Sequence, residues 1–447
     1  MDLSHSQAQR PPATPVYVLR GHAAAVHAIH FYSDNVRLAS GDADGWVIIW
    51  DITTKRPVAA WKAHEGAILN LKSVDSLPNT ESRDEKDEMS KTQEKKIFTH
   101  GRDNYLRVWR LNSDDEEILD NRLPVEENST SDNRAEPWLI YSVTVNALNF
   151  CGFAITTRPS LSHAAKTASS VCETFIAVPN ALDTGGIDIF HLPTQKRVCI
   201  LHADRAINTG MVMALQLFFS PNADLYIVSG YEDGHAMVHV QRGPIIITED
   251  TVDSTVSTLT WNWEKVYSSR AHSQPILSLD IFPTDKKYFL TSSADAIIAK
   301  HPIPVEIGDS NLKNDAPVRV VNTKHAGQQG LTIRSDERIL VTAGWDNRAR
   351  VYSCKSLKEL AVLKWHKEGC YAVSLAYVEP DIKSMRPPVD STVASPVKKE
   401  PESIALTLKS SPGSLAGIKQ QRHREATLTH WVAVGSKDGK ISLWDIY

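Results

Sequence analysis

Two widely separated parts of the chain carry the same alternation of apolar and polar residues. Near the start, a turn at Asp44-Gly45 is followed by an alternating run that closes on Trp50. The end of the chain repeats this arrangement, with a turn at Asp438-Gly439 and a run that closes on Trp444. Such alternation predicts strands with one buried face, and the Asp-Gly pairs predict the tight turns that join them into hairpins.

The same unit recurs between these two copies, and seven copies can be counted along the chain. The second copy is complete, with Asp103 six residues before Trp109. The third copy, over 175–190, lacks both the leading His and the Trp. The fourth, fifth and sixth copies have another residue at the position of the Trp: His239, His301 and Tyr352.

A repeat of about 40 to 45 residues that runs from Gly-His to Trp-Asp resembles the WD40 family, whose repeats form the blades of a propeller. We therefore expect an all-β fold, a seven-bladed WD40 β-propeller with long inserts on one face. The last copy ends with its third strand, at Tyr447. Residues 16–20 have the length and alternation of the missing outer strand, so we expect the N-terminus to close the ring and cover its open edges.

The resemblance also implies a buried hydrogen-bonded network in each blade, made by a His, a strand Ser or Thr, the turn Asp and the Trp. Ser, His and Asp also form hydrolase triads, but a nucleophile would not recur at the same position of successive repeats. We assign the networks, copy by copy, to His22, Ser40, Asp44 and Trp50; His64, Thr99, Asp103 and Trp109; His202, Ser229 and Asp233; His272, Thr291 and Asp295; His325, Thr342 and Asp346; and His366, Asp438 and Trp444.

The chain has 447 residues, roughly 140 more than seven repeats of about 43 residues require. We expect a disordered tail over 1–14 and one propeller over 15–447, with the excess in loops. The insert near the end is rich in Pro, Ser and Lys, and we expect it to be largely disordered. All the inserts follow the first or third strand of a blade and so share one face: 74–96, 112–137, 156–170, 243–263, 302–318 and 379–429.

Composition excludes several classes of protein. The net charge is −4, which gives no overall basic field for nucleic acid. Five cysteines without close pairs suggest reduced thiols, and no apolar run is long enough for a signal peptide core or a membrane span. The sequence contains no CxxC or HExxH motif and no glycine-rich phosphate loop, so we expect no metal, no cofactor and no enzymatic activity.

Three other propeller functions can be weighed against the sequence. Residues 345–348, Trp-Asp-Asn-Arg, match the WDxR motif of cullin ubiquitin ligase receptors, but they lie at the turn between the second and third strands rather than after the third. A G-protein β-subunit needs an N-terminal coiled-coil helix, which residues 1–14 cannot form. A reader of histone tails or other peptides would use the face with short loops, where Trp46 and Trp345 are expected, and this alternative stays open.

At the family level the chain resembles the fungal ASTRA-associated proteins. The resemblance rests on the opening 15–22, the run 39–45, the degenerate middle copies, the long insert near the end and the terminal run 434–445. It implies a nuclear subunit of the ASTRA assembly, which is linked to chromatin remodelling and to the maturation of PI3-kinase-like kinases. The implied partners are RuvB-like AAA+ ATPases, Tel2-type co-chaperone subunits and a PI3-kinase-like scaffold, without direct contact to nucleic acid or membrane.

Overall fold

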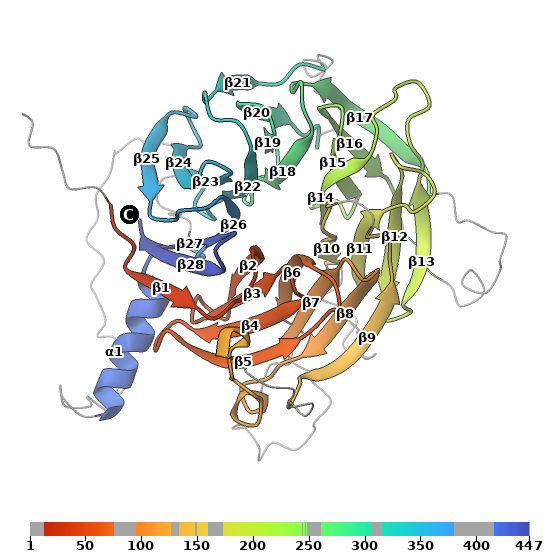
Figure 1. Ribbon diagram of the computed structural model, residues 1–447. Helices are drawn as coiled ribbons and strands as arrows, with labels where there is room; N and C mark the ends of the chain where they lie inside the picture. Colours follow the sequence, from red (N-terminus) through yellow and green to blue (C-terminus); the bar gives the residue numbers. More distant parts are fainter. Residues whose placement is uncertain are drawn as a thin grey trace, which may run out of the picture.

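The computed structural model describes residues 13–75, 95–126, 134–147, 150–159, 173–243, 245, 247, 261–305, 315–379 and 415–446. These residues form seven four-stranded antiparallel sheets, which stand side by side in a ring (Figure 1). The expected all-β, seven-bladed propeller is confirmed.

Each blade is one sheet with its strands in the order a, b, c and d from the centre of the ring outwards. In blades 1 to 6 the four strands follow one another in sequence, whereas blade 7 takes its d strand from the N-terminus. The strands a to d are, blade by blade, β2 (Val26–Tyr32), β3 (Arg37–Asp42), β4 (Trp46–Asp51) and β5 (Arg56–Lys62); β6 (Ile68–Asp75), β7 (Lys95–Gly101), β8 (Tyr105–Arg110) and β9 (Trp138–Thr144); β10 (Ala154–Thr157), β11 (Thr174–Pro179), β12 (Ile187–Leu192) and β13 (Lys196–Leu201); β14 (Val212–Phe219), β15 (Leu225–Tyr231), β16 (His235–Gln241) and β17 (Trp263–Arg270); β18 (Ile276–Ile281), β19 (Tyr288–Ser293), β20 (Ile297–Pro302) and β21 (Arg319–Asn322); β22 (Gln328–Ile333), β23 (Ile339–Gly344), β24 (Arg348–Ser353) and β25 (Glu359–Lys364); and β26 (Cys370–Leu375), β27 (Trp431–Ser436), β28 (Lys440–Asp445) and β1 (Tyr17–Arg20).

The hydrophobic core is a ring of apolar clusters between neighbouring blades. The b strands are buried on both faces because a neighbouring blade packs on each side; β15, for example, has Leu225, Ile227 and Val228 fully buried. One cluster joins blades 3 and 4 through Phe175 and Leu217, and others lie between the remaining pairs of blades. The stability of each blade therefore depends on both of its neighbours, as in other repeat proteins.

The N-terminal strand closes the ring as the sequence predicts. Strand β1 pairs antiparallel with β28, with Tyr17 opposite Leu443 and Arg20 opposite Lys440. Leu19 is buried in the cluster that joins blade 7 to blade 1. Figure 1 shows the two ends of the described chain lying next to each other at this position.

Tight turns between the b and c strands bring blade 1 against blade 2 and blade 7 against blade 1. Gly45 has φ +86°, and a Cβ there would lie 1.9 Å from the carbonyl oxygen of His64. Gly439 has φ +72°, and its Cβ would lie 2.5 Å from the carbonyl oxygen of His22. Glycine is needed at both positions because the backbone conformation and the close contact exclude a side chain. These turns pack against the loops that carry the network histidines.

Part of the 112–137 insert folds back over blade 1. It contains two short 3-10 helices, η1 (Asp115–Glu117) and η2 (Pro124–Glu126). The amide of Ala60 in β5 donates to the carbonyl of Asp120 at 2.7 Å, so the insert occupies the outer edge of blade 1. Arg37 pairs with Glu116 at 2.6 Å, and Leu123 packs against the cluster beside β1. The sequence placed this insert in a loop but did not indicate that it covers a neighbouring blade.

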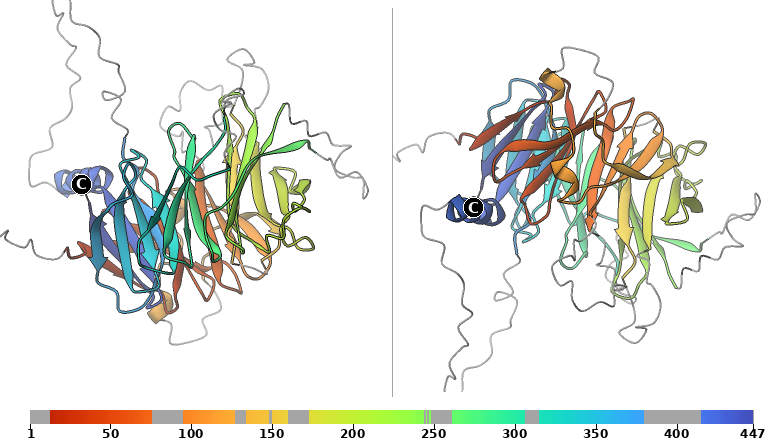
Figure 2. Two further views of the ribbon diagram at one scale, coloured as in Figure 1. Left: turned by 90° about the horizontal axis from the view of Figure 1, so that it is seen from above. Right: turned by 90° about the horizontal axis from the view of Figure 1, so that it is seen from below.

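The end of the 379–429 insert forms the helix α1 (Leu415–Leu428), which the expectation of disorder did not include. Its last turn is attached to the ring, because Ala426 is buried and its carbonyl accepts a hydrogen bond from Trp431 Nε1 at 3.0 Å. Asn35 Nδ2 donates to the carbonyl of Thr427 at 3.2 Å. The preceding turns are exposed, and Figures 1 and 2 show the helix standing outside the ring beside blade 7. Residues 380–414 and the tail 1–12 lie outside the described residues.

Candidate functional site

Blade 2 assembles the complete network that the sequence predicts. Trp109 Nε1 donates to Thr99 Oγ1 at 2.9 Å, and Thr99 Oγ1 lies 2.8 Å from His64 Nε2. His64 Nδ1 lies 2.9 Å from Asp103 Oδ1, and Arg107 Nη1 donates to Asp103 Oδ2 at 2.8 Å. The network joins the b and c strands of the blade to the loop that precedes its a strand.

The charges of blade 2 fix the direction of these hydrogen bonds. Burial alone would raise the pKa of Asp103, but hydrogen bonds from His64 and Arg107 lower it below its usual range. Burial lowers the pKa of His64, so its ring is neutral at pH 7. The ionised Asp103 accepts the Nδ1 proton, and His64 Nε2 in turn accepts the proton of Thr99. Because the Thr99 side chain is fully buried, its hydroxyl cannot contact a substrate while the blade stays folded.

Blade 1 forms an equivalent network, but with a different aspartate from the predicted one. Ser40 Oγ accepts from Trp50 Nε1 at 2.9 Å and lies 2.7 Å from His22 Nε2. The carboxylate 2.7 Å from His22 Nδ1 belongs to Asp42, whereas Asp44 is exposed. Asp42 also accepts the backbone amides of Asp44 and Trp46 at 3.0 Å each. The assignment of Asp44 to this network is therefore corrected to Asp42.

The residue at the end of the b strand explains this exchange. Gly101 holds the position in blade 2 that Asp42 holds in blade 1, since each is the last residue of its b strand. A Cβ at Gly101 would lie 2.3 Å from His64 Nδ1, so its absence leaves room for Asp103 to reach the imidazole from the turn. In blade 1 the Asp42 carboxylate fills this space, and Asp44 turns outwards.

Blade 5 retains a network in which an imidazole replaces the indole. His272 Nδ1 lies 3.1 Å from Asp295 Oδ1, and its Nε2 lies 2.8 Å from Thr291 Oγ1. On the other side of Thr291, His301 Nε2 lies at 2.9 Å, and Tyr267 Oη lies 2.9 Å from His301 Nδ1. Burial would raise the pKa of Asp295, but its hydrogen bond with His272 lowers it, so the ionised Asp295 accepts the Nδ1 proton of His272. His272 Nε2 then accepts the proton of Thr291, and His301 Nε2 donates to Thr291, as the Trp does elsewhere. Burial lowers the pKa of His301 to about 3, so the ring stays neutral.

Blade 7 takes its hydroxyl from a different strand, which sequence reasoning missed. Ser442 in the c strand, rather than a residue of the b strand, lies 2.8 Å from His366 Nε2 and accepts from Trp444 Nε1 at 2.8 Å. Asp438 lies 3.5 Å from His366 Nδ1. The b strand has Val434 opposite Ser442, which leaves the c-strand serine as the local hydroxyl.

The residues predicted for blade 4 do not come together. The side chain of His202 is 66% exposed and lies 3.8 Å from Asp183, away from Ser229. Ser229 Oγ instead donates to Tyr231 Oη at 3.1 Å, and Asp233 pairs with His235 at 2.6 Å. The assignment of His202, Ser229 and Asp233 to one network is therefore wrong.

Blade 6 also lacks the predicted network. His325 is bonded through its backbone: its amide donates to Thr323 Oγ1 at 3.3 Å, and its carbonyl accepts from Gln328 Nε2 at 3.2 Å. Its side chain does not join the buried Thr342 in a network. Asp346 is occupied by Arg350, whose Nη1 donates at 3.1 Å and Nη2 at 2.5 Å. Burial would raise the pKa of Asp346, but this ion pair lowers it.

The spacing between the histidine and the following a strand separates the two groups of blades. In the four blades with a network the histidine stands four residues before the first residue of its a strand, as His64 stands before Ile68. His325 stands only three residues before Gln328, and His202 stands ten residues before Val212. The histidine ring can reach the hydroxyl only from the first of these positions, so this count was the sequence signal that could have identified the exceptions.

Other residue types with possible chemistry can also be placed among the described residues. No group of three or more His, Cys, Asp or Glu side chains among them is placed to hold a metal ion. Residues 345–348 lie at the turn between β23 and β24, as their spacing predicts, with Asp346 held by Arg350. Four of the described cysteines are buried and take part in no disulfide: Cys151, Cys199, Cys354 and Cys370. Helix α1 is not long and apolar enough to cross a membrane.

Comparisons with known proteins show which family the sequence belongs to. A sequence profile of the family described as ASTRA-associated protein 1 matches residues 15–444. The ASTRA-associated protein 1 of Aspergillus niger is 49% identical over 460 aligned positions, and that of Penicillium rubens is 48% identical over 457, each alignment covering the whole of both chains. The protein of the same name from Schizosaccharomyces pombe is 31% identical and covers 80% of this chain and 91% of its own length. The chain therefore belongs to the ASTRA-associated protein 1 family.

Proposed function

We propose that the chain is a non-catalytic protein-interaction scaffold that works as a subunit of the ASTRA assembly in the nucleus. The observation that carries this proposal is the full-length match to relatives named for their association with ASTRA. A second observation supports the non-catalytic part. Ser40 and Thr99 would be the nucleophiles if their networks were hydrolase triads, but both residues are fully buried inside their blades.

The resemblance to this family supports a specific set of partners. We expect RuvB-like AAA+ ATPases, Tel2-type co-chaperone subunits and a PI3-kinase-like scaffold to associate with the propeller. In that setting the chain would serve chromatin remodelling and the maturation of PI3-kinase-like kinases. Because the blade networks are buried, contacts with these subunits must be made by the loops, the rim of the ring or helix α1.

Affinity purification of the tagged full-length chain from fungal nuclear and cytoplasmic extracts, followed by mass spectrometry, tests the proposal. We expect the ATPases and co-chaperone subunits to be recovered from the nuclear extract in stoichiometric amounts. A tagged propeller of another family, expressed at the same level, is the control. Recovery of histones in place of these subunits would favour a reader of histone tails, and recovery of a cullin adaptor would favour a ubiquitin ligase receptor. Either result would contradict the proposal.

A further inference from the structure

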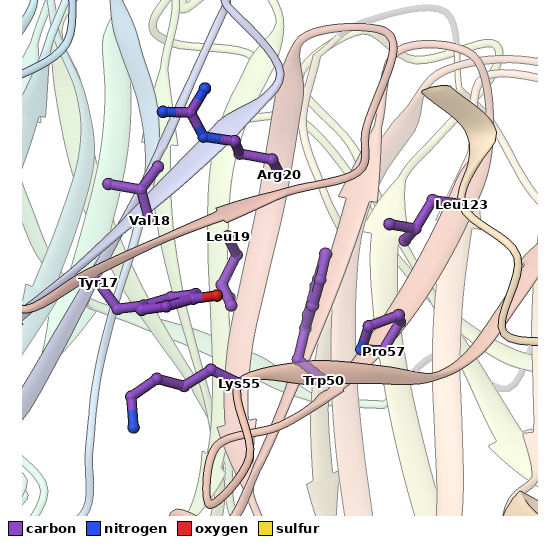
Figure 3. A pocket seen from close by; sticks show the side chains of 8 residues that line it. All are labelled: Tyr17, Val18, Leu19, Arg20, Trp50, Lys55, Pro57 and Leu123. Carbon is purple, nitrogen blue, oxygen red and sulfur yellow. The ribbon is translucent and has the colours of Figure 1, made fainter. Parts of the chain in front are cut away.

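A groove lies on the rim of the ring where blade 7 meets blade 1. Its volume is about 420 Å³, within the usual range for ligand sites. It runs along β1, and the residues that line it are Tyr17, Val18, Leu19, Arg20, Trp50, Lys55, Pro57 and Leu123 (Figure 3). The N-terminal strand, blade 1 and the 112–126 segment all contribute to it, so it exists only because these three parts of the chain meet.

One side of the groove is a strand edge without a strand partner. Strand β1 is the terminal strand of its sheet, and within the described part of the chain only β28 pairs with it. The neighbouring outer strand β5 differs, since its amide at Ala60 is already bonded to Asp120. A free edge of this kind offers backbone donors and acceptors to an extended peptide.

The bottom of the groove is apolar. Figure 3 shows Leu19 pointing from β1 towards Trp50, with Pro57 and Leu123 on the far side. The indole of Trp50 is fixed because its Nε1 donates to Ser40. Leu123 is held by the backbone hydrogen bond from Val125 to Gly21 at 3.2 Å. Leu19 and Trp50 are almost fully buried at the base, whereas Pro57 and Leu123 are half-buried and offer the apolar surface that a partner's side chain can reach. Because this surface is preformed, the entropic cost of binding is lowered.

Both charged side chains that line the groove are cations. Arg20 is exposed on β1, and Lys55 follows the c strand of blade 1. Neither forms an ion pair with a carboxylate among the described residues; Lys55 Nζ lies 3.5 Å from the carbonyl of Ile52. Nearby acids are already used, because Asp51 accepts from Thr53 and Asp120 pairs with Arg122. The groove is therefore complementary to negative charge.

A second cavity, of about 390 Å³, shows that this charge pattern is not general. It borders the outer strand β17, where Lys265 is paired with Asp204 and Asp315 is part of the lining. Arg270 is a second cation of the lining, so two cations stand beside two carboxylates when Asp204 is counted with Asp315. The rest of the lining is mostly polar.

We propose that the rim groove binds an extended, acidic peptide segment of a partner protein. The peptide adds as a strand to the free edge of β1, places an apolar side chain against Pro57 and Leu123, and places carboxylates beside Arg20 and Lys55. The proposal names the kind of partner segment that the scaffold binds, and it rests on the proposed scaffold function. Its test uses the isolated chain, so a failure here leaves the recovery of ASTRA subunits unaffected.

The test uses a synthetic bead library of seven-residue peptides whose two end residues are both Asp, both Asn or both Lys, with randomised central positions. The purified full-length chain should retain peptides with Asp ends in preference to those with Lys ends. The best binder is then resynthesised with N-methyl groups on alternate backbone amides. Since strand addition needs those amides, one of the two methylated registers should lose binding at least about tenfold.

Variants of the chain then locate the site. Arg20→Glu combined with Lys55→Glu should weaken binding of the best peptide at least about tenfold, because two favourable charge contacts become repulsive. The matched control, Lys355→Glu with Lys358→Glu, makes the same charge change on exposed residues of blade 6 and should leave binding unchanged. Thermal unfolding of both variants checks that the propeller is intact.

Three results would overturn the proposal: retention of no peptide from the library, equal binding by the two double variants, or full binding by both N-methylated registers. A further result would also overturn the proposal: a dimer of the parent chain, seen by light scattering, that the Arg20→Glu, Lys55→Glu variant no longer forms. The groove would then bind a second copy of the chain.

Discussion

Blades 2 and 4 have the same strand order but are held together differently. In blade 2, Thr99 links His64 to Trp109 inside the sheet. In blade 4 the position of the Trp is taken by His239, which is 8% exposed, and its Nδ1 has no hydrogen-bond partner among the described residues. Blade 4 relies instead on apolar packing, with Tyr226, Ile227 and Val228 fully buried in its b strand.

The comparison shows that the hydrogen-bond network is not what shapes a blade. Both blades have the same irregularity in the pairing of the c and d strands, immediately before Trp109 in blade 2 and before His239 in blade 4. The same shift precedes Phe190 in blade 3, which has no network. The geometry therefore follows from strand pairing and apolar burial, whereas the network adds stability to the blades that have it.

The largest difference is expected between two neighbouring aspartates. Asp42→Ala should lower the free energy of unfolding by about 3 kcal/mol, because it leaves the buried His22 and the backbone amides of two turn residues without their acceptor. Asp44→Ala should leave the unfolding midpoint unchanged, since Asp44 is exposed. Urea unfolding of the two variants measures this, and equal effects would show that the assignment of Asp42 is wrong.

The second-largest difference in stability is expected between substitutions of the histidines of blades 2 and 4. His64→Ala should cost about 2 kcal/mol because Thr99 and Asp103 both lose a buried partner. His202→Ala removes a side chain that is mostly exposed, and the midpoint of urea unfolding should stay within error of the parent protein. A large loss of stability in the His202 variant would mean that blade 4 has a network after all.

Acid should weaken blade 5 through its second imidazole. The pKa of His301 is lowered to about 3 by burial and by the nearby His272, whereas in the unfolded chain it is about 6.5. The unfolded state therefore takes up a proton that the folded state does not, and stability is lost as the pH falls from about 6.5 towards 3. His301→Gln can still donate to Thr291 and accept from Tyr267.

Removing this titration should flatten the pH dependence. Between pH 6 and 4 the free energy of unfolding of the His301→Gln variant should fall less steeply than that of the parent, by up to about 1.4 kcal/mol per pH unit. Urea titrations at pH 7, 6, 5 and 4 give both slopes. Identical slopes would show that His301 does not remain neutral when folded.

The smallest expected effect has the opposite sign in the two blades. Trp109→Phe should destabilise blade 2 by about 1 kcal/mol because Thr99 loses a buried donor. His239→Phe should be neutral or stabilising by up to about 1 kcal/mol, because it removes a buried nitrogen without a partner and adds apolar surface. Parallel thermal melts compare them, and destabilisation of similar size in both would contradict the difference between the blades.

The repeat made the fold predictable, because the turn and the alternating strand recur at a regular distance and the last copy lacks one strand. The site was less predictable, since residue type alone does not place a side chain. His202 and His325 have the right identity but the wrong distance from the a strand. The exchange of Asp44 for Asp42 depends on the residue that ends the b strand, which is an aspartate only in blade 1 among the four blades with a network; Gly101, Ser293 and Ser436 hold that position in the other three.

Features that depend on long-range contacts gave no local signal. The covering of blade 1 by the 112–126 segment rests on contacts such as Arg37 with Glu116, which join different blades. Helix α1 is anchored through Asn35, a residue of blade 1. The rim groove also depends on long-range contacts, because Leu123 and β1 come from distant parts of the sequence.

A pair of double-mutant cycles tests the central claim most directly, namely that the polar side chains act as one unit in blade 2 and independently in blade 4. The first cycle combines His64→Ala with Trp109→Phe, and the second combines His202→Ala with His239→Phe. Urea unfolding should give a coupling free energy of about 0.5 to 3 kcal/mol in blade 2 and none in blade 4. No coupling between His64 and Trp109, or equal coupling in the two blades, would contradict the account.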